Sequence, residues 1–169
     1  MFHNALVIAY LALGSNLGDR QAYLESAIHS LSRHGVQVLR SASVYLTEPH
    51  EVLDQPWFLN TVVEANTLLG PEQLLEACLA VEEENSRKRT GTKNARTLDI
   101  DIIFYGDTVL KKPGLAIPHP AFRNRRFVLE PLAEIAPGFV DPVSGKTVRQ
   151  LLEAAADSTE VRHFRPPLL

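Results

Sequence analysis

The sequence has 169 residues, of which 45% are hydrophobic and 22% are charged, as in an ordinary globular domain. Its longest apolar run, residues 5–13, is too short for a membrane span of about 20 residues, and no Lys or Arg precedes it as in a secretory signal. A single cysteine excludes an intramolecular disulfide, which fits a reducing compartment, so we expect a cytoplasmic location. The length suits one domain over residues 1–169, and the short apolar run predicts no membrane contact.

Positive charge is concentrated in one part of the chain, although the formal net charge is −3. Residues 86–126 contain ten of the 17 Lys and Arg residues but only three of the 20 Asp and Glu residues. A basic segment in an otherwise acidic protein indicates a localised anion site rather than a broad nucleic-acid surface.

Strand and helix patterns alternate over the first hundred residues. The apolar run 5–13 predicts a central strand that ends at a loop over residues 14–18, and Asp19 is placed to cap a helix that reaches about His34. The next predicted elements are a β-rich stretch over 36–47, a strand over 57–69, a helix from Pro71 to about Arg87 and a strand over 98–105. The order β-α-β-β-α-β predicts an α+β, ferredoxin-like fold with helices packed on an antiparallel sheet.

An irregular C-terminal extension is expected after Tyr105. Pro113, Pro118 and Pro120 exclude long elements in the segment that contains them. Short helices are expected near 127–134 and 147–155, and the tail beyond about Asp157 carries no recognisable motif.

The strand over 98–105 carries the most informative polar pattern. Alternation places Asp99 and Asp101 on one face, whereas the opposite, core-facing side is predicted to hold Leu98, Ile100, Ile102 and Phe104. Two strand steps separate the aspartates by roughly 6–7 Å. That spacing suits carboxylates that hold two magnesium ions about 3.5–4 Å apart, with phosphate oxygens as further ligands. Five cations precede the strand: Arg87, Lys88, Arg89, Lys93 and Arg96.

The phosphates of such a site would be held by side chains and metal, because the known glycine cradles are missing. Neither G-x-x-x-x-G-K-[ST] nor G-x-G-x-x-G occurs in the sequence. Gly145-Lys146-Thr147 copies the end of the first motif, but Val140 stands at the position of its first glycine.

Further motifs follow one another from about Leu6 to Leu152, and together they resemble a known family. They are Gly14-Ser15-Asn16-Leu17-Gly18, Asp54-Gln55-Pro56-Trp57-Phe58-Leu59-Asn60, residues 82–89, Arg96-Thr97-Leu98-Asp99-Ile100-Asp101-Ile102, Ile117-Pro118-His119-Pro120 and Arg123-Asn124-Arg125-Arg126-Phe127. In this order they are similar to the motifs of 6-hydroxymethyl-7,8-dihydropterin pyrophosphokinases, which are enzymes of folate biosynthesis.

The resemblance implies a reaction and a set of site residues. The pterin hydroxymethyl oxygen would attack the β-phosphorus of ATP, and AMP would leave. By resemblance, Asp99 and Asp101 bind two magnesium ions and act in catalysis together with Arg87 and Arg96. The ATP-site positions are Glu82, Arg87, Arg89, Arg96, His119 and Arg125. The pterin-site positions are Phe58 and Phe127 as stacking rings, Asn60 at the pterin edge, and the backbone of Thr47, Pro49 and His50.

The resemblance also implies a monomer that binds pterin and ATP but no nucleic acid. One departure is the run Lys93-Asn94-Ala95-Arg96, where many members have a longer loop with Gly-Pro. Residues 48–54 and 90–95 are hypothesised to be lids that close over ATP. Two alternatives stay open: a degenerate member that binds ATP or pterin without turnover, and a ferredoxin-like RNA-binding module.

Overall fold

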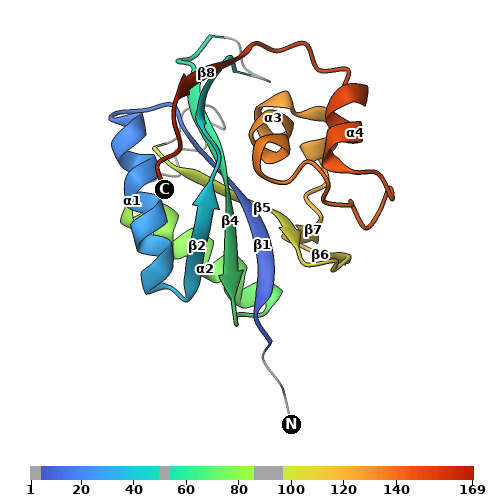
Figure 1. Cartoon of the computed structure of the whole chain (residues 1–169). Coiled ribbons are helices and arrows are strands. Elements are labelled where there is room, and N and C mark those ends of the chain that lie inside the picture. Colours follow the sequence, from blue (N-terminus) through green and yellow to red (C-terminus); the bar gives the residue numbers. More distant parts are fainter. Residues whose placement is uncertain (1–4, 50–53, 86–96) are drawn as a thin grey trace.

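The structure is a computed structural model, in which residues 5–49, 54–85 and 97–169 are described (Figure 1). Its centre is an antiparallel sheet with the strand order β5-β1-β4-β3-β8, in which β2 also pairs with β4. Three of these strands are β2 (Val36–Ser41), β3 (Val44–Thr47) and β8 (Val161–Arg165). The central strands are β1 (Val7–Ser15) and β4 (Phe58–Thr67), and β5 (Asp99–Tyr105) forms one edge. The predicted ferredoxin-like α+β core is confirmed, although β1 extends two residues beyond the expected end at Leu13.

The predicted β-rich stretch over 36–47 forms two short strands. These strands, β2 (Val36–Ser41) and β3 (Val44–Thr47), lie one after the other along β4. At the break between them, the Ala42 amide still donates to the Val62 carbonyl oxygen over 2.9 Å. The pair therefore serves as one interrupted strand of the sheet.

One face of the sheet is covered by α1 (Arg20–Arg33) and α2 (Pro71–Glu84) (Figure 1). The Asp19 carboxylate accepts a hydrogen bond from the Ala22 amide, as the capping prediction requires. The second helix ends at Glu84 rather than near Arg87, with Asn85 at its carboxyl cap. Fully buried aliphatic side chains of both helices and the strands form the main core here, including Leu11, Leu13, Leu24, Leu31, Leu74 and Val81.

The opposite face carries α3 (Arg126–Ile135) and α4 (Val148–Ala154), close to the predicted short helices. They are preceded by β6 (Leu110–Lys112), β7 (Leu115–Ile117) and the 3-10 turn η1 (Phe122–Asn124). This side has a second core, in which aromatic rings of Tyr10, Phe104, Phe122 and Phe139 meet at angles.

The predicted position of Phe104 in the main core is wrong. Tyr10 pairs with Phe104 but Leu11 pairs with Ile102, so Ile103 is an extra residue in β5. Such a bulge breaks the alternation of side chains along a strand. Phe104 therefore lies in the second core with Ile103, whereas Leu98, Ile100 and Ile102 are in the main core as predicted.

The tail, for which the sequence predicts no structure, adds an edge strand to the sheet. This strand, β8 (Val161–Arg165), pairs antiparallel with β3, and Figure 1 shows it crossing from α4 to the far edge. Across the described ranges 5–49, 54–85 and 97–169, no helix is both long enough and apolar enough to cross a membrane.

Candidate active site

Asp99 and Asp101 lie on the face of the sheet that also carries the second core. Asp101 pairs with Ala12 and Asp99 with Gly14 across the β5–β1 ladder. Both side chains are partly exposed, and Asp101 keeps 33% of its side-chain surface in contact with solvent. The shared face is as predicted, and it gives two neighbouring acceptors for a cation at the edge of the sheet.

Gly14 lies between Asp99 and Asn60 in one row across three neighbouring strands. It pairs with Asn60 on one side and with Asp99 on the other. A Cβ atom at position 14 would lie 2.4 Å from the Asn60 Oδ1 atom and 3.6 Å from Phe58. Position 14 therefore has room for the Asn60 amide only because it carries no side chain. With strands about 4.8 Å apart, the two outer residues of this row are separated by about 10 Å.

The Asn60 side chain is fixed by one short hydrogen bond. Its Nδ2 atom donates to the Thr47 hydroxyl over 2.6 Å, and the residue is only 8% exposed. Phe58, two residues earlier, points to the same face and is partly exposed, and its backbone pairs with that of Thr47. The structure thus brings together three predicted pterin-site residues, and Pro49 is buried close by in the chain.

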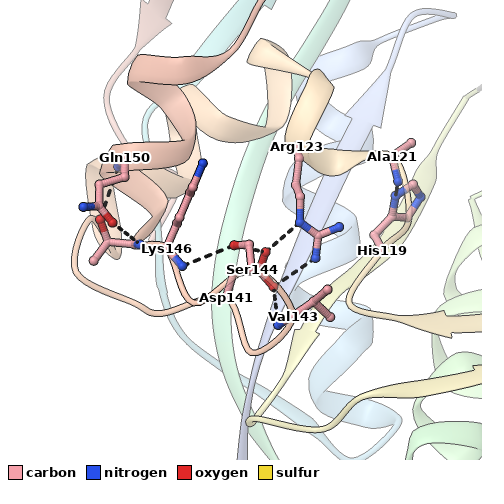
Figure 2. A network of polar contacts seen from close by, with 9 residues as sticks. His119, Ala121, Arg123, Asp141, Val143, Ser144, Lys146 and Gln150 are labelled. Carbon is pink, nitrogen blue, oxygen red and sulfur yellow. Dashed lines mark hydrogen bonds and ion pairs between the residues drawn. The ribbon is translucent and has the colours of Figure 1, made fainter.

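The contacts of His119 define which ring nitrogen carries a proton. Its Nδ1 atom accepts from the Ala121 amide over 3.1 Å (Figure 2), so the proton of a neutral ring is on Nε2. Nε2 lies 4.0 Å from Asp101 Oδ1. Burial, together with the positive charge of Arg125, lowers the pKa of His119 from 6.5 to about 4 despite the opposing charge of Asp99. His119 is therefore a neutral N–H donor beside the aspartates at neutral pH.

Glu82, in α2, contacts β5, the strand that carries the two aspartates. It is only 3% exposed, and its Oε2 atom accepts from the Ile100 amide over 2.8 Å. Because Ile100 lies between the two aspartates, this bond from α2 fixes the edge strand that carries them. The predicted ATP-site residue thus makes a structural contact with β5.

Arg125 and Phe127 lie at the start of α3. The Arg125 guanidinium carbon is 5.6 Å from the centre of the Phe127 ring. Phe127 is partly buried against the second core. A cation stacked on an aromatic ring restrains both side chains.

A cavity of about 340 Å³ opens beside Asp101 and His119. Its walls come from α2, β5 and the β6–β7 hairpin, and they are mainly apolar. The lining residues are Leu75, Ile100, Asp101, Ile102, Lys112, Gly114, Leu115, Ala116, His119 and Pro120. A mainly apolar cavity with a few polar groups suits a small organic ligand.

Several predicted residues fall outside the described ranges. They are Arg87, Arg89, Arg96 and His50, together with most of the two hypothesised lids.

Three hydrogen bonds that sequence reasoning missed connect the loop after β1 and the start of α1 to the segment before β4. The Asn16 side chain, 2% exposed, donates to Gln55 Oε1 over 2.9 Å and to the Pro56 carbonyl over 3.1 Å. The Arg20 guanidinium donates to the Trp57 carbonyl over 2.8 Å. The only sequence signal was that both segments belong to the family motifs. These bonds set the position of Phe58 and Asn60, which follow directly.

The segment before α3 is held by a buried ion pair. Arg123 Nε and Nη2 donate to the two Asp141 carboxylate oxygens over 2.6 and 2.9 Å (Figure 2). Asp141 is fully buried and also accepts from the Ser144 hydroxyl over 2.7 Å. Burial raises the pKa of Asp141, but the hydrogen bonds from Arg123 and Ser144 outweigh it and bring the pKa from 3.8 to about 2.

The fold and site together define a class: a ferredoxin-like domain whose paired carboxylates, beside an apolar cavity, suit metal-assisted phosphate transfer. Comparison with known proteins then identifies the family. Residues 10–137 match the family model described as 7,8-dihydro-6-hydroxymethylpterin-pyrophosphokinase. The chain therefore belongs to this family, and the resemblance predicted from its motifs is confirmed.

Individual relatives agree with this assignment. Over 88% of the chain there is 39% identity to "Folic acid synthesis protein fol1" of Pneumocystis carinii, of which the chain spans only 20%. The chain is 43% identical, over 85% of its length, to the 2-amino-4-hydroxy-6-hydroxymethyldihydropteridine pyrophosphokinase of Methylorubrum extorquens, of which the match covers 90%. The crystal structure of Plasmodium falciparum HPPK-DHPS A437G with STZ-DHP has the same fold, with a TM-score of 0.72 and 18% identity over 89% of this chain and 45% of that one.

Proposed function

We propose that the protein transfers the pyrophosphate group of ATP to the hydroxymethyl group of 6-hydroxymethyl-7,8-dihydropterin and releases AMP, as a step of folate biosynthesis. The observation that carries the proposal is the row Asp99–Gly14–Asn60. It places Asp99 and Asn60 on one face of the sheet, with their strand positions about 10 Å apart, which fits a polyphosphate at one end and a flat heterocycle at the other.

The cavity beside Asp101 is the proposed place for the ATP base and ribose. It is mainly apolar, and Asp101 and His119 are among its polar lining residues, together with Lys112, so a nucleotide there could direct its phosphates toward the aspartates. The His119 Nε2–H can donate to a phosphate oxygen, because Nδ1 is occupied by the Ala121 amide. Arg125 is a described cation whose charge acts on His119, and Arg87, Arg89 and Arg96 stay predicted ATP-site residues.

Asp99 and Asp101 are the proposed ligands of two magnesium ions. No cluster of three or more His, Cys, Asp or Glu side chains suited to a metal occurs in the described part of the chain. A carboxylate pair is nevertheless sufficient for magnesium, which commonly takes one or two carboxylates and completes its shell with phosphate oxygens and water. When bound, the ions would neutralise the polyphosphate charge and make the β-phosphorus more electrophilic.

The pterin would lie between the Phe58 and Phe127 rings with its polar edge at Asn60. The Asn60 amide can both donate and accept, which suits a ring edge that carries both kinds of group. The hydroxymethyl oxygen then forms a bond to the β-phosphorus, and the bond from that phosphorus to the α,β-bridging oxygen breaks, so that AMP leaves with this oxygen. The hydroxyl proton passes to solvent water. The protein contributes positioning and charge, which dominate phosphoryl-type transfer.

The remaining parts of the proposal concern the whole molecule. We propose one pyrophosphokinase domain over residues 1–169, since β8 in the tail completes the same sheet as β1. A monomeric state and a cytoplasmic location stay predictions from the sequence. The degenerate binder without turnover is distinguished by product analysis, and family membership disfavours the RNA-binding module.

The test is a product analysis with ATP, magnesium and the pterin, in which AMP and pterin pyrophosphate are separated by chromatography. We expect AMP only when pterin and magnesium are both present, and a loss of at least about a thousandfold, or about 4 kcal/mol, in Asp99→Ala and Asp101→Ala. Asp107→Ala is the matched control, because Asp107 is exposed just beyond the same strand. ADP as the product, or activity retained without both aspartates, would refute the proposal.

A further inference from the structure

The amino end of α3, which carries Phe127, is capped by a residue from the tail. Arg125 makes no side-chain cap at this helix. Instead the Asp157 Oδ2 atom accepts from the Arg126 amide over 2.9 Å. A carboxylate at this position satisfies an otherwise unpaired amide and interacts favourably with the positive end of the helix dipole.

Asp157 is itself held in a tight turn. Its Oδ1 atom accepts from the Thr159 amide and its Oδ2 atom from the Thr159 hydroxyl, both over 2.9 Å. The Arg126 side chain adds a contact to the Thr159 carbonyl at 3.5 Å. The tail is thus attached to the start of α3 by side chains and backbone from both partners.

Three residues further on, the tail is attached to the other wall of the site. The Glu48 amide donates to the Glu160 carbonyl over 3.1 Å, and the Glu160 amide donates back to the Glu48 carboxylate over 2.9 Å. Val161 then pairs with Thr47, whose hydroxyl holds Asn60. Without β8, β3 would be an edge strand of the sheet.

The far end of α3 is joined to β3 directly, because the Glu134 carboxylate accepts from the Ser43 amide and the Tyr45 hydroxyl. We propose that residues 157–161 are a strap that fixes the near end of α3 and thereby sets the distance between the two walls of the pterin site there. Four residue steps span at most about 14 Å, so the start of α3 cannot move far from β3 while both ends of the strap are attached. None of these residues is among the predicted substrate contacts, and the strap residues are positioning residues for pterin binding. This inference rests on the proposed function, because the ligand between the walls is taken to be the pterin.

The test compares Asp157→Ala, Asp157→Asn and the control Glu153→Ala, in which an exposed carboxylate of α4 is removed. Equilibrium dialysis measures the affinity for 6-hydroxymethyl-7,8-dihydropterin with a non-hydrolysable ATP analogue present, and separately for the analogue alone. We expect Asp157→Ala to weaken pterin binding about fivefold, equal to about 1 kcal/mol, with nucleotide affinity changed less than twofold. Asp157→Asn should retain most of the affinity, since its amide oxygen can still accept from Arg126.

Hydrogen exchange gives a readout at the helix itself. Amides of residues 126–130 should exchange faster in Asp157→Ala than in Glu153→Ala, while those of α1 stay unchanged. Equal pterin affinity in these two variants would overturn the inference, as would a parallel loss of both ligand affinities together with thermal stability. Wild-type protein that binds pterin but forms no AMP would refute the proposed function alone, and wild-type protein that binds no pterin would refute both.

Discussion

Replacing Gly14 by alanine should separate ligand binding from stability. The added Cβ would lie 2.4 Å from Asn60 Oδ1, so the Asn60 side chain has to move and its 2.6 Å bond to Thr47 is disturbed. Disturbing a buried hydrogen bond costs about 1–3 kcal/mol. Alanine also restricts the unfolded chain, which returns about 0.4–1 kcal/mol. The net destabilisation is then about 1 kcal/mol, or a Tm lowered by about 3 °C.

Gly14→Ala should weaken pterin binding more than it lowers the free energy of unfolding. The displaced Asn60 amide then no longer faces the proposed position of the pterin edge. We expect the KM for pterin to rise at least about tenfold, or about 1.4 kcal/mol, with the KM for ATP changed less than twofold. Steady-state kinetics with each substrate varied, together with thermal unfolding, measures both quantities. Gly138→Ala is the control, because nothing lies within 4 Å of a Cβ built there.

A double-mutant cycle tests whether Gly14→Ala acts on pterin binding through the Asn60 side chain. In an Asn60→Ala background the clash is absent, so Gly14→Ala should add little to the pterin KM. Strictly additive effects of the two substitutions, or an unchanged pterin KM in Gly14→Ala alone, would refute the role given to this glycine.

Two further predictions concern the frame around the site. The pKa of Asp141 in the folded protein, about 2, lies below its ordinary value of 3.8. The carboxylate therefore adds about 2 kcal/mol to the free energy of unfolding above about pH 4, and this contribution is lost as the pH falls toward 2. Urea unfolding between pH 7 and 2.5 should show this loss in wild type and its absence in Asp141→Asn; equal pH slopes would contradict the assignment. Glu82→Ala should cost about 1–3 kcal/mol in thermal unfolding, since the Ile100 amide loses its buried acceptor, and Glu82→Gln should cost less. A raised KM for ATP in Glu82→Gln without any change in Tm would instead indicate direct nucleotide contact.

Local patterns predicted the parts of the fold that depend on local chemistry. The cap at Asp19, the proline at the start of α2 and the alternation around Asp99 and Asp101 each act within a few residues, and the structure has them as predicted. The alternation of the strand residues is therefore sufficient to place the carboxylate pair on one face. Its role as a magnesium site remains a proposal.

Features that depend on distant partners could not be predicted in this way. The bulge at Ile103 is a property of the pairing between β5 and β1, and it moved Phe104 to the other face. The strand β8 is mostly exposed and has no apolar alternation of its own, so only its partner β3 makes it a strand. The cap that Asp157 provides for α3 comes from 31 residues away along the chain.

The bulge explains how one face of the sheet can hold both a polar site and an aromatic core. Before Ile103, β5 presents Asp99 and Asp101 to that face; after it, Phe104 packs against Tyr10 and Phe122. A regular strand would have placed Phe104 in the aliphatic core under α2 and left the second core without its central ring. The aspartates are instead followed directly by a densely packed segment. That rigidity matters because transfer between two bound substrates depends on the positions of the reacting atoms more than on any covalent contribution from the protein.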